Sequence, residues 1–515
     1  MTVPAFDVLA QLERRWSDPE RELLRFYGRR YTAAEILASS RNVAAALHRI
    51  GIGPGSTVAI DLTNRPEFFE TLLGAWRAGA TVTPVNTQLR SEEIRHQLHD
   101  SGSRLIVYET RVAERVEEAL RDLPGSIARV VIDPRLPVDE GTAAFDAWAR
   151  PGTGKEVGAE PPENLFVIYT SGTTGRPKGA ILTAGNVYHE ALALRQALGL
   201  EAADRMIVVL PLFHVNNLML GFATFLVGGS VTILRWFEVD DFVREVARAR
   251  PTFFSGVPTV YKRLLDVADR IDRSALGSLR FAVCGAAPMP VTWLNEFQSR
   301  FGIPIVEGYG LTEGTVASTV NPRHGCRKVG SVGIPLPGQE VRVVDEADRE
   351  LPPGEVGEVV VRGPNVMKGY LGRESETRET LRDGWLHTGD LGRFDDDGYL
   401  YLVDRMKDLI IRGGENVYPK EVENVLLEHP DIADAAVVGA PDEAYGERVI
   451  AFVVRHDEAL SRETVLDYCR QRLAAFKCPT EVLFVGELPR NSVGKVQKPA
   501  LRQQAPVRAR SLPSP

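Results

Sequence analysis

Residues 165–183 read LFVIYTSGTTGRPKGAILT, and the organisation of the chain can be worked out from this stretch. Two apolar runs, at 165–169 and 180–183, flank a loop of small and hydroxyl-bearing residues that ends near Lys178. Backbone N–H groups, hydroxyls and an ammonium are ligands for an anion, so the loop predicts a phosphate site between two strands. It is not a Walker loop, because its glycine spacing differs, no Ser or Thr follows the lysine and no helix start comes after it.

Strands and helices alternate on both sides of this loop. Upstream, the capping-box pattern of Thr32 and Glu35 predicts a helix that ends near Gly51. Further segments predict strands at 56–62, 81–86 and 104–109, helices at 65–80 and 91–100, and downstream strands at 206–210, 231–234, 279–285 and 303–310. This alternation is typical of a wound α/β sheet, in which ligands bind at the carboxyl ends of the strands.

The pattern changes after residue 330. Closely spaced strands with Gly- and Pro-rich turns over 330–403 predict an antiparallel β subdomain. Beyond 403–408 there follow helices at 419–428 and 462–473 and strands at 433–440, 447–455 and 481–485. The expected fold class is therefore α/β, with a large N-terminal domain (1–406) of wound α/β sheets plus an antiparallel β subdomain, and a small α+β C-terminal lid (407–515).

Composition excludes several classes of protein. The 61 Lys+Arg and 69 Asp+Glu leave a net charge of −8, which argues against a nucleic-acid binder. With 44% hydrophobic and 25% charged residues the chain is typical of a globular protein, and its four cysteines suit neither a disulfide framework nor a paired zinc site. The N-terminus lacks the pattern of a signal peptide, and the uncharged stretch 206–234 is interrupted by Pro, His, Asn and Gly. We expect a cytoplasmic protein without a membrane span.

Six further motifs accompany the loop in a fixed order. They are PLFH (211–214), GYGLTE (308–313), HTGD (387–390), DRMKD (404–408), GGEN (413–416) and PRNSVGK (489–495). Together with the loop they resemble the adenylate-forming superfamily, and among its members the acyl-CoA synthetases and fatty-acid–CoA ligases, over residues 30 to 500. The resemblance implies a two-step ligase of fatty acid metabolism that uses ATP, Mg²⁺ and CoA. A carboxylate displaces pyrophosphate from ATP to give acyl-AMP, and a thiol then displaces AMP.

The resemblance also implies roles for residues of the nucleotide site. Glu313 is the expected Mg²⁺ ligand with the Thr170 hydroxyl as helper, Tyr309 the adenine platform and Asp390 the ribose ligand. Arg405 is the second ribose and phosphate contact. The implied ATP- and AMP-binding residues are Thr170, Ser171, Gly172, Thr173, Thr174, Gly175, Lys178, Gly285, Ala286, Ala287, Glu307, Gly308, Tyr309, Gly310, Leu311, Thr312, Asp390, Arg405 and Lys495.

Three positions are expected to govern the chemistry and the movement of the lid. Lys495 matches the family's catalytic lysine, whose ammonium bridges the attacking carboxylate and the α-phosphate, and His214 matches a residue that orients the carboxylate and gates the thiol. Lys407 lies where the family swivels its mobile lid, so it is the expected hinge. The resemblance gives CoA and its pantetheine arm contacts at Gly413, Gly414, Glu415 and Lys477.

The acyl pocket should be built from the ends of the sheet strands and the loops beside them. Its predicted lining is His214, Val215, Asn216, Asn217, Phe254, Ser255, Val257, Cys284, Gly285, Gly310, Leu311 and Val316. These side chains are apolar or small with a few amides, and a buried second carboxylate would need a partner. Arg280, the one basic residue nearby, is a weak basis for a dicarboxylate, so we expect a largely apolar monocarboxylic acid: medium to long chain, alicyclic or aromatic. Asn216 and Asn217 leave room for a hydroxylated or carnitine-like one.

Other functions are left open by the motifs. The first alternative is transfer of the acyl group to a carrier-protein phosphopantetheine in natural-product biosynthesis, and a luciferase-like oxidative enzyme is a remote third. A non-catalytic nucleotide-binding protein would be expected to lack Glu313, Asp390 or Lys495, and all three are present. The expected partners are a small carboxylic acid, ATP and CoA, with a carrier protein and a homodimer left open and no nucleic acid.

Overall fold

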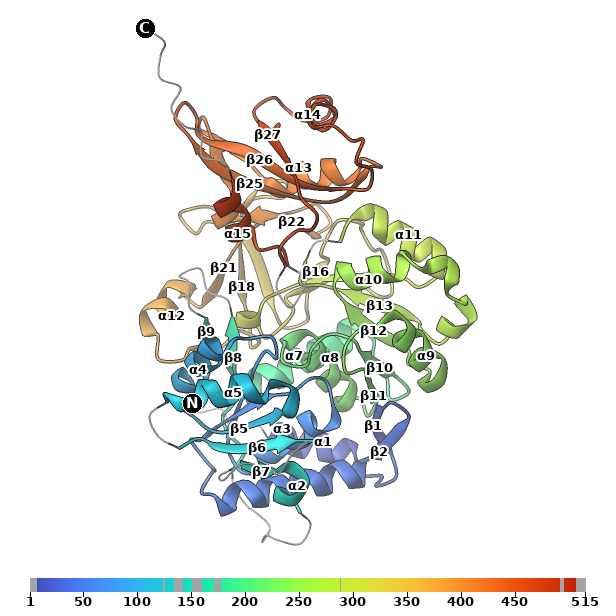
Figure 1. Ribbon diagram of the computed structural model, residues 1–515, viewed down its shortest axis with the longest axis vertical. Helices are drawn as coiled ribbons and strands as arrows, with labels where there is room; N and C mark the ends of the chain where they lie inside the picture. The colour runs from blue at the N-terminus through green and yellow to red at the C-terminus, as the bar shows by residue number, and fades with distance from the viewer. Residues whose placement is uncertain are drawn as a thin grey trace.

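The computed structural model describes residues 7–123, 126–133, 142–150, 160–170, 177–287, 289–490 and 495–505. Up to Arg405 the chain forms a large body, and the residues from Leu409 onward form a smaller C-terminal unit above it (Figure 1). The 3-10 turn η5 (Met406–Asp408) lies between them. The predicted limits 1–406 and 407–515 and the predicted mobility of the smaller part stay predictions.

The loop quoted first closes a hairpin in an eight-stranded sheet. The strand order is β19-β9-β8-β4-β3-β5-β6-β7, and β8 and β9 pair antiparallel while β3 to β8 pair parallel. The strands are β3 (Thr57–Asp61), β4 (Thr81–Pro84), β5 (Ser103–Glu109), β6 (Ala128–Ile132), β7 (Thr142–Ala144), β8 (Asn164–Thr170), β9 (Lys178–Thr183) and β19 (Gly369–Tyr370). The predicted strands at both ends of the loop are therefore confirmed.

A nine-stranded sheet supplies the other half of the body. Its order is β16-β15-β14-β13-β12-β10-β11-β1-β2, with β10 to β14 parallel. The strands are β1 (Glu22–Phe26), β2 (Arg29–Thr32), β10 (Arg205–Val208), β11 (Ser230–Ile233), β12 (Phe253–Gly256), β13 (Phe281–Cys284), β14 (Ile305–Tyr309), β15 (Thr319–Val320) and β16 (Ile334–Pro335). The wound α/β architecture expected from the alternation is thus observed.

One large core holds the two sheets together. Apolar residues of both sheets share it with α2 (Ala33–Arg49), α3 (Pro66–Arg77), α7 (Ala184–Leu198) and α8 (Val215–Leu226). The outer faces are covered by α4 (Ser91–Asp100) and α5 (Ala113–Arg121) on one sheet and by α9 (Val239–Ala249), α10 (Pro258–Leu265) and α11 (Val291–Phe301) on the other. The Thr32–Glu35 capping box forms as predicted, and the uncharged stretch 206–234 contains the buried helix α8.

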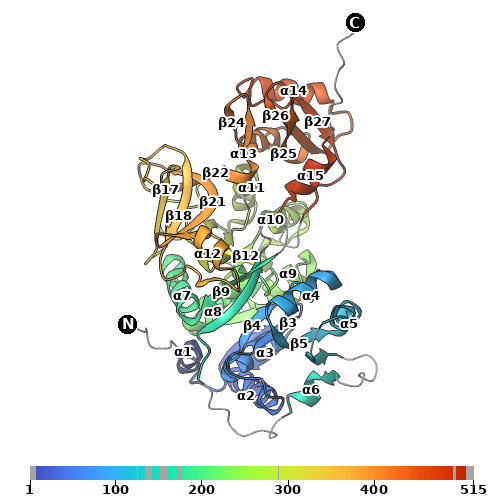
Figure 2. The ribbon, with the colours of Figure 1, turned by 90° about the vertical axis from the view of Figure 1, so that its left-hand side faces the viewer.

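The antiparallel subdomain predicted over 330–403 lies between this body core and the C-terminal unit (Figure 2). Its strands are β17 (Glu340–Val344), β18 (Gly357–Arg362), β20 (Leu381–Arg382), β21 (Trp385–Phe394) and β22 (Leu400–Arg405), with α12 (Glu374–Thr380) at its side. The β21–β22 pairing places Asp390 opposite Arg405. Tyr309 of β14 belongs to the apolar cluster of this sheet, so the subdomain and the nine-stranded sheet meet at that residue.

The C-terminal unit has its own sheet and its own apolar clusters. The strands are β23 (Ile410–Arg412), β24 (Glu415–Val417), β25 (Ile432–Asp442), β26 (Gly446–Arg455) and β27 (Glu481–Phe484), and the helices are α13 (Pro419–Leu427), α14 (Arg462–Arg470) and α15 (Lys498–Gln504). The predicted order of helix, two strands, helix and strand is confirmed. The remaining helices are α1 (Val8–Arg15) and α6 (Phe145–Trp148), with short 3-10 turns η1 (Thr110–Val112), η2 (Ala268–Arg270), η3 (Arg273–Leu276) and η4 (Thr312–Gly314).

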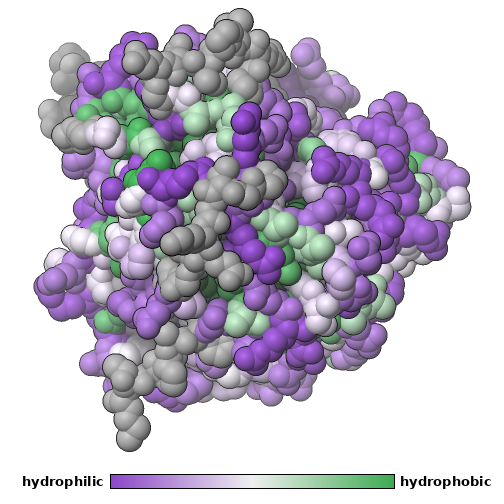
Figure 3. All heavy atoms as spheres, turned by 90° about the horizontal axis from the view of Figure 1, so that it is seen from below, coloured by the Kyte–Doolittle hydropathy of each residue, from purple (hydrophilic) through white to green (hydrophobic). Residues whose placement is uncertain are grey.

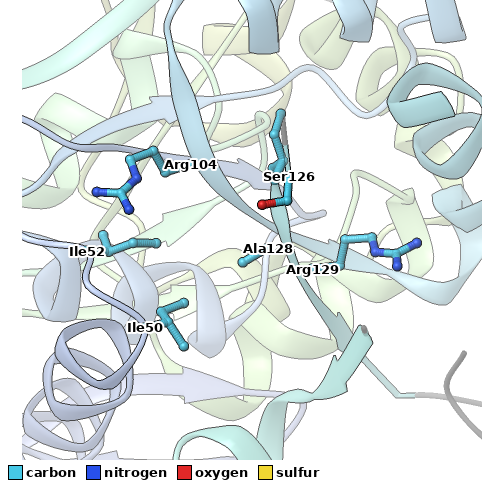
Figure 4. A pocket seen from close by; sticks show the side chains of 7 residues that line it. Ile50, Ile52, Arg104, Ser126, Ala128 and Arg129 are labelled. Carbon is cyan, nitrogen blue, oxygen red and sulfur yellow. The ribbon is translucent and has the colours of Figure 1, made fainter. Parts of the chain in front are cut away.

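Among the described residues, no helix is both long enough and apolar enough to cross a bilayer. The face opposite the C-terminal unit carries hydrophilic residues with scattered small apolar areas (Figure 3). A cavity of about 290 Å³ opens beside β5 and β6 of the eight-stranded sheet, with Ile50, Ile52, Arg104 and Arg129 around it (Figure 4).

Candidate active site

The predicted nucleotide residues come from the ends of three strands and the middle of a fourth, in three sheets. Thr170 ends β8, Gly285 follows β13, Tyr309 ends β14, and Asp390 lies on β21. Ser171, Gly172, Thr173, Thr174 and Gly175 lie outside the described residues, so their predicted phosphate contacts stay predictions.

Glu313 is held by two hydroxyls. It lies in η4, directly after the end of β14, and its Oε1 accepts hydrogen bonds from Thr170 Oγ1 at 3.3 Å and from the Tyr370 hydroxyl at 2.8 Å. Carboxylate and hydroxyl oxygens are the hard ligands that Mg²⁺ takes together with water and substrate phosphates, so this pair fits the metal. No local sequence pattern marks Tyr370, because only the pairing of β19 with β9 brings it here.

Lys178 is buried at the start of β9, with its ammonium 5.3 Å from the centre of the Tyr370 ring. A cation over an aromatic face is stabilised by the ring electrons. The predicted lysine of the phosphate loop and Glu313 therefore both contact Tyr370, the lysine at its ring and the carboxylate at its hydroxyl.

Asp390 is fixed by two neighbours from different elements. The Tyr309 hydroxyl donates to its Oδ2 at 2.8 Å, and Arg405 Nε lies 3.0 Å from its Oδ1. Because each carboxylate oxygen has two lone pairs, one remains on each oxygen for a further donor. Tyr309, Asp390 and Arg405 thus form one row across β14, β21 and β22, joined by a hydrogen bond and an ion pair.

The glycines of the site leave no room for larger side chains. A Cβ on Gly310 would lie 2.2 Å from the Val316 carbonyl oxygen, and one on Gly308 would lie 3.2 Å from that of Thr319. Gly310 is therefore required by the close approach of the backbone that follows β14. Ala286 adopts a left-handed conformation (φ 67°) at the exposed turn after Gly285, which is uncommon for alanine. Leu311 and Thr312 continue from Gly310 into η4, and Ala287 follows Ala286.

Lys495 comes from the C-terminal unit and reaches the body. Its ammonium interacts electrostatically with Asp390 and Glu313, and with the cations of Arg405 and Lys407. Burial, followed by the nearby charge of Arg405, lowers the pKa of Lys495 to about 8. The predicted catalytic lysine is therefore placed beside both predicted nucleotide carboxylates.

His214 lies at the N-terminal end of α8, with its ring 4.5 Å from that of Phe213 and its Nε2 buried without a hydrogen-bond partner. Burial, and then the positive charge of Lys495, lower the pKa of His214 to about 4. The imidazole is thus neutral at pH 7 and lies within electrostatic reach of Lys495. A neutral imidazole can orient a neighbouring group, and the predicted gating of the thiol by His214 stays a prediction.

Lys407 lies in η5, and its backbone carbonyl is 3.5 Å from Arg502 Nη2. The residue as a whole is exposed, but the protein atoms packed around its ammonium, and then the charge of Arg405, lower the pKa of Lys407. Its function as a hinge stays a prediction.

Glu307 lies two residues before Tyr309 and is buried. Burial raises the pKa of Glu307 to about 7, opposed by the nearby ammonium of Lys420. Lys420 belongs to the C-terminal unit and was not anticipated, since a lysine at the start of a helix is ordinarily a solvent-exposed residue.

The structure brings some of the predicted acyl-pocket residues together. The Ser255 hydroxyl donates to Asn216 Oδ1 at 2.7 Å, and the Asn216 amide nitrogen lies 3.5 Å from the position of a Cβ on Gly285. Asn216, Ser255 and Gly285 therefore form one small, polar wall, and His214 precedes Asn216 by two residues. Val215 and Val316 are half-buried and pack against the large core.

Other predicted lining residues point elsewhere. Phe254 lies on the opposite face of β12 from Ser255, fully buried with its ring 5.1 Å from Phe242, because strand side chains alternate. Val257 and Cys284 pack in the same outer core. Asn217 is fully buried and donates to the Leu210 carbonyl at 3.3 Å. The structure does not bring these four to the wall around Asn216.

Three of the four predicted CoA residues lie at one exposed turn of the C-terminal unit, and Lys477 lies elsewhere in it, half-buried. Gly413 and Gly414, with φ of 62° and 85°, make the turn between β23 and β24, and Glu415 follows it. Two consecutive positive φ values suit a tight hairpin turn built from glycine. The Lys477 ammonium bonds both oxygens of Glu421 at 2.7 and 2.8 Å, so the structure gives it a partner within the unit. The CoA roles of these residues stay predictions.

Comparisons with known proteins cover nearly the whole chain. The family described as AMP-binding enzyme matches residues 12–371, and the AMP-binding enzyme C-terminal domain matches residues 421–495. The chain is 38% identical over 497 residues to a feruloyl-CoA synthase of Amycolatopsis sp, which covers 94% of this chain and 96% of that protein.

Two solved structures are similar in both sequence and fold. ATP-bound MatB from Rhodopseudomonas palustris superimposes with a TM-score of 0.89 at 33% identity, covering 96% of this chain and 98% of the other. The O-succinylbenzoate Coenzyme A synthetase (MenE) from Bacillus subtilis, in complex with ATP and a magnesium ion, gives a TM-score of 0.83 at 34% identity, covering 96% and 98%.

Proposed function

The chain belongs to the AMP-binding enzymes, within the acyl-CoA synthetase branch of the adenylate-forming superfamily, and on that premise we propose that it ligates a largely apolar monocarboxylic acid to CoA. As an AMP-forming acid–thiol ligase it uses ATP, Mg²⁺ and CoA. The observation that carries the proposal is the convergence of Lys495 with Glu313 and Asp390, three charged residues from separate parts of the chain.

The first half-reaction joins two anions. A carboxylate oxygen of the acid attacks the α-phosphorus of ATP, the bond from that phosphorus to the bridging oxygen breaks, and pyrophosphate leaves with acyl-AMP remaining. Because like charges must approach, catalysis depends on positioning and on fixed cations. We assign Lys495 to the incoming carboxylate and α-phosphate, and Lys178 to the phosphates.

The nucleotide is oriented by the row across β14, β21 and β22. Asp390 keeps one acceptor site on each oxygen for the ribose hydroxyls, while Arg405 and Tyr309 hold its carboxylate in place. Glu313 and Thr170 would hold Mg²⁺, which when bound neutralises phosphate charge. Gly308 and Gly310 let the backbone approach the adenine.

In the second half-reaction the CoA sulfur attacks the acyl carbonyl, AMP leaves with the bonding electrons, and the thiol proton passes to solvent. His214 remains neutral at pH 7 and borders the Asn216 wall, so it orients the acyl carboxylate and limits access of the thiol. A thiol with a pKa near ~8.5 ionises sufficiently without a dedicated base.

The nature of the acid is inferred from charge. Arg280, the basic residue considered for a second carboxylate, is ion-paired with buried Asp204 at the amino end of β13, whereas the proposed acyl wall lies beyond its carboxyl end. Arg280 therefore contributes no positive charge to the wall of Asn216, Ser255 and Gly285. An acid with one carboxylate and a mainly hydrocarbon body, aliphatic, alicyclic or aromatic, suits these residues. The feruloyl-CoA synthase relative makes aromatic acids the first to test.

The proposal is tested by pyrophosphate release with ATP and Mg²⁺ across a panel of acids, with and without CoA, for the wild type and Lys495→Ala. We expect one class of apolar monocarboxylic acids to give a CoA thioester only when CoA is present, and Lys495→Ala to suppress adenylation. Acyl-AMP that accumulates and is not discharged by CoA would favour the carrier-protein acceptor. Turnover restricted to dicarboxylic acids would contradict the proposed substrate class.

A further inference from the structure

Lys420 is a cation of the C-terminal unit that is bonded to the body. It is the second residue of α13, and its Nζ donates to the Leu402 carbonyl oxygen at 2.9 Å. Its backbone N–H donates to Asp404 Oδ2 at 2.8 Å. Leu402 and Asp404 lie on β22, which pairs with β21 in the antiparallel sheet of the body. Two hydrogen bonds of one residue therefore cross the junction between the two parts of the chain.

The charges around this ammonium also come mainly from the body. Asp404, Glu307 and Asp390 lie within its electrostatic reach, and so does Glu423 of its own helix. Glu307 is buried two residues before Tyr309, and Asp390 is bonded to Tyr309. Lys420 is thus anchored close to the row of residues proposed to bind the nucleotide.

A second contact connects this anchor with Lys495. Glu423, one helical turn after Lys420 on α13, forms an ion pair with Lys498 at 2.9 Å. Lys498 begins α15 and comes three residues after Lys495. A continuous series of contacts therefore runs from β22 through α13 to the start of α15, beside the residue that enters the active site.

We propose that Lys420 is a positioning residue for the adenylation half-reaction. It fixes α13 against β22 and thereby holds Lys495 near Glu313 and Asp390. The inference rests on the proposed function, because it assigns Lys420 a role through the catalytic lysine. Replacing the ammonium leaves the Leu402 carbonyl without its donor and the nearby carboxylates without their counter-charge. The packing of α13 on β22 is therefore weakened, and with it the placement of the C-terminal unit. Thioester formation from acyl-AMP already made does not need Lys495 and should be spared.

The test compares Lys420→Met with two other variants. Lys420→Arg keeps the charge and a donor. Arg455→Met is the matched control. Arg455 also donates to main-chain carbonyls, those of Glu458 and Leu460 at 2.7 and 3.1 Å, but both of these acceptors lie within the C-terminal unit. Three quantities are measured: pyrophosphate release, thioester formation from synthetic acyl-AMP and CoA, and acylation of Lys495 by an amine-reactive reagent, quantified by mass spectrometry against exposed Lys368.

For Lys420→Met we expect adenylation to fall at least tenfold, transfer from acyl-AMP to stay within twofold of the wild type, and labelling of Lys495 to rise severalfold. Lys420→Arg should recover most of the adenylation, and Arg455→Met should match the wild type in all three measurements. If Lys420→Met does not fold, Lys420→Gln is judged by the same criteria.

A parallel loss of both half-reactions, or unchanged labelling of Lys495, would overturn the inference. The labelling measurement needs no turnover. A wild type that adenylates no acid would therefore count against the proposed function. The labelling of Lys495 in Lys420→Met would still show whether Lys420 positions Lys495.

Discussion

Asp390 and Arg405 face each other across β21 and β22, with Oδ1 and Nε 3.0 Å apart, while the Tyr309 hydroxyl bonds the other carboxylate oxygen. The two strands thus present a carboxylate whose orientation is set before a nucleotide arrives. Such preorganisation reduces the entropy lost on binding.

Asp390→Asn should weaken ATP binding with little change of fold, because the amide keeps the shape but replaces one acceptor by a donor. We expect the KM for ATP to rise about tenfold or more, which corresponds to roughly 1.4 kcal/mol or more, and the KM for the acid to change less than twofold. Initial rates of pyrophosphate release at varied ATP measure this. Asp397→Asn, in an exposed turn of the same sheet, is the control and should match the wild type.

Tyr370→Phe should alter the dependence on Mg²⁺. The hydroxyl that donates to Glu313 Oε1 at 2.8 Å is lost, so the carboxylate loses an orienting partner while the ring beside Lys178 remains. We expect the Mg²⁺ concentration for half-maximal activity to rise several-fold at saturating ATP, with near-normal activity restored at high Mg²⁺. A lower maximal rate with an unchanged Mg²⁺ requirement would contradict this role.

Adenylation should decline as pH rises through about 8. Burial and the cations of Arg405 and Lys407 lower the pKa of Lys495, against the carboxylates of Asp390 and Glu313, and the protonated ammonium is the active form. This decline should appear in kcat/KM for ATP, which reports ionisations of the free enzyme. In kcat the decline should occur at higher pH, because bound phosphates favour the charged form of the lysine. His214, neutral above about pH 4, should add no transition between pH 5 and 8. Lys495→Arg should remove the decline of activity near pH 8, since the guanidinium stays charged.

Gly310→Ala should damage both stability and nucleotide binding. The added Cβ would lie 2.2 Å from the Val316 carbonyl oxygen, and backbone on both sides must move to relieve the contact. We expect a loss of roughly 1–3 kcal/mol of stability, typical of overpacking, measured by thermal or denaturant unfolding. Gly486→Ala is the matched control, because no atom lies within 4 Å of its added Cβ. Equal stability of the two variants would contradict the role assigned to Gly310.

Much of the architecture could be predicted because local patterns and tertiary packing agree. The strands at 165–169 and 303–310 are short apolar runs that end in turn residues, and β8 and β14 form there. The capping box at Thr32 was predictable because it satisfies the helix terminus locally. The order of elements in the C-terminal unit followed from periodicity in the same way.

The site was predictable only in part, for a physical reason. Glu313, Asp390 and Lys495 stand in distinctive motifs, whereas Tyr370 and Lys420 reach their places through a two-residue strand and a contact between the two parts of the chain. The direction of Phe254 could not be predicted, because side chains alternate between the two faces of a strand. In a short apolar strand that is buried on both faces, the sequence does not show which residues point to which face. The pairing of Lys477 with Glu421 likewise depends on tertiary structure.

Lys495 also follows every other residue of the proposed site in chain order, and this has a consequence for biosynthesis. A ribosome makes the nucleotide-binding body first, with Asp390 and Glu313 already available for folding, and only later releases the lysine that completes the centre. A nascent or prematurely terminated chain could therefore retain nucleotide without activating any acid. With the role proposed for Lys495, ligase activity can begin only after translation has passed that residue.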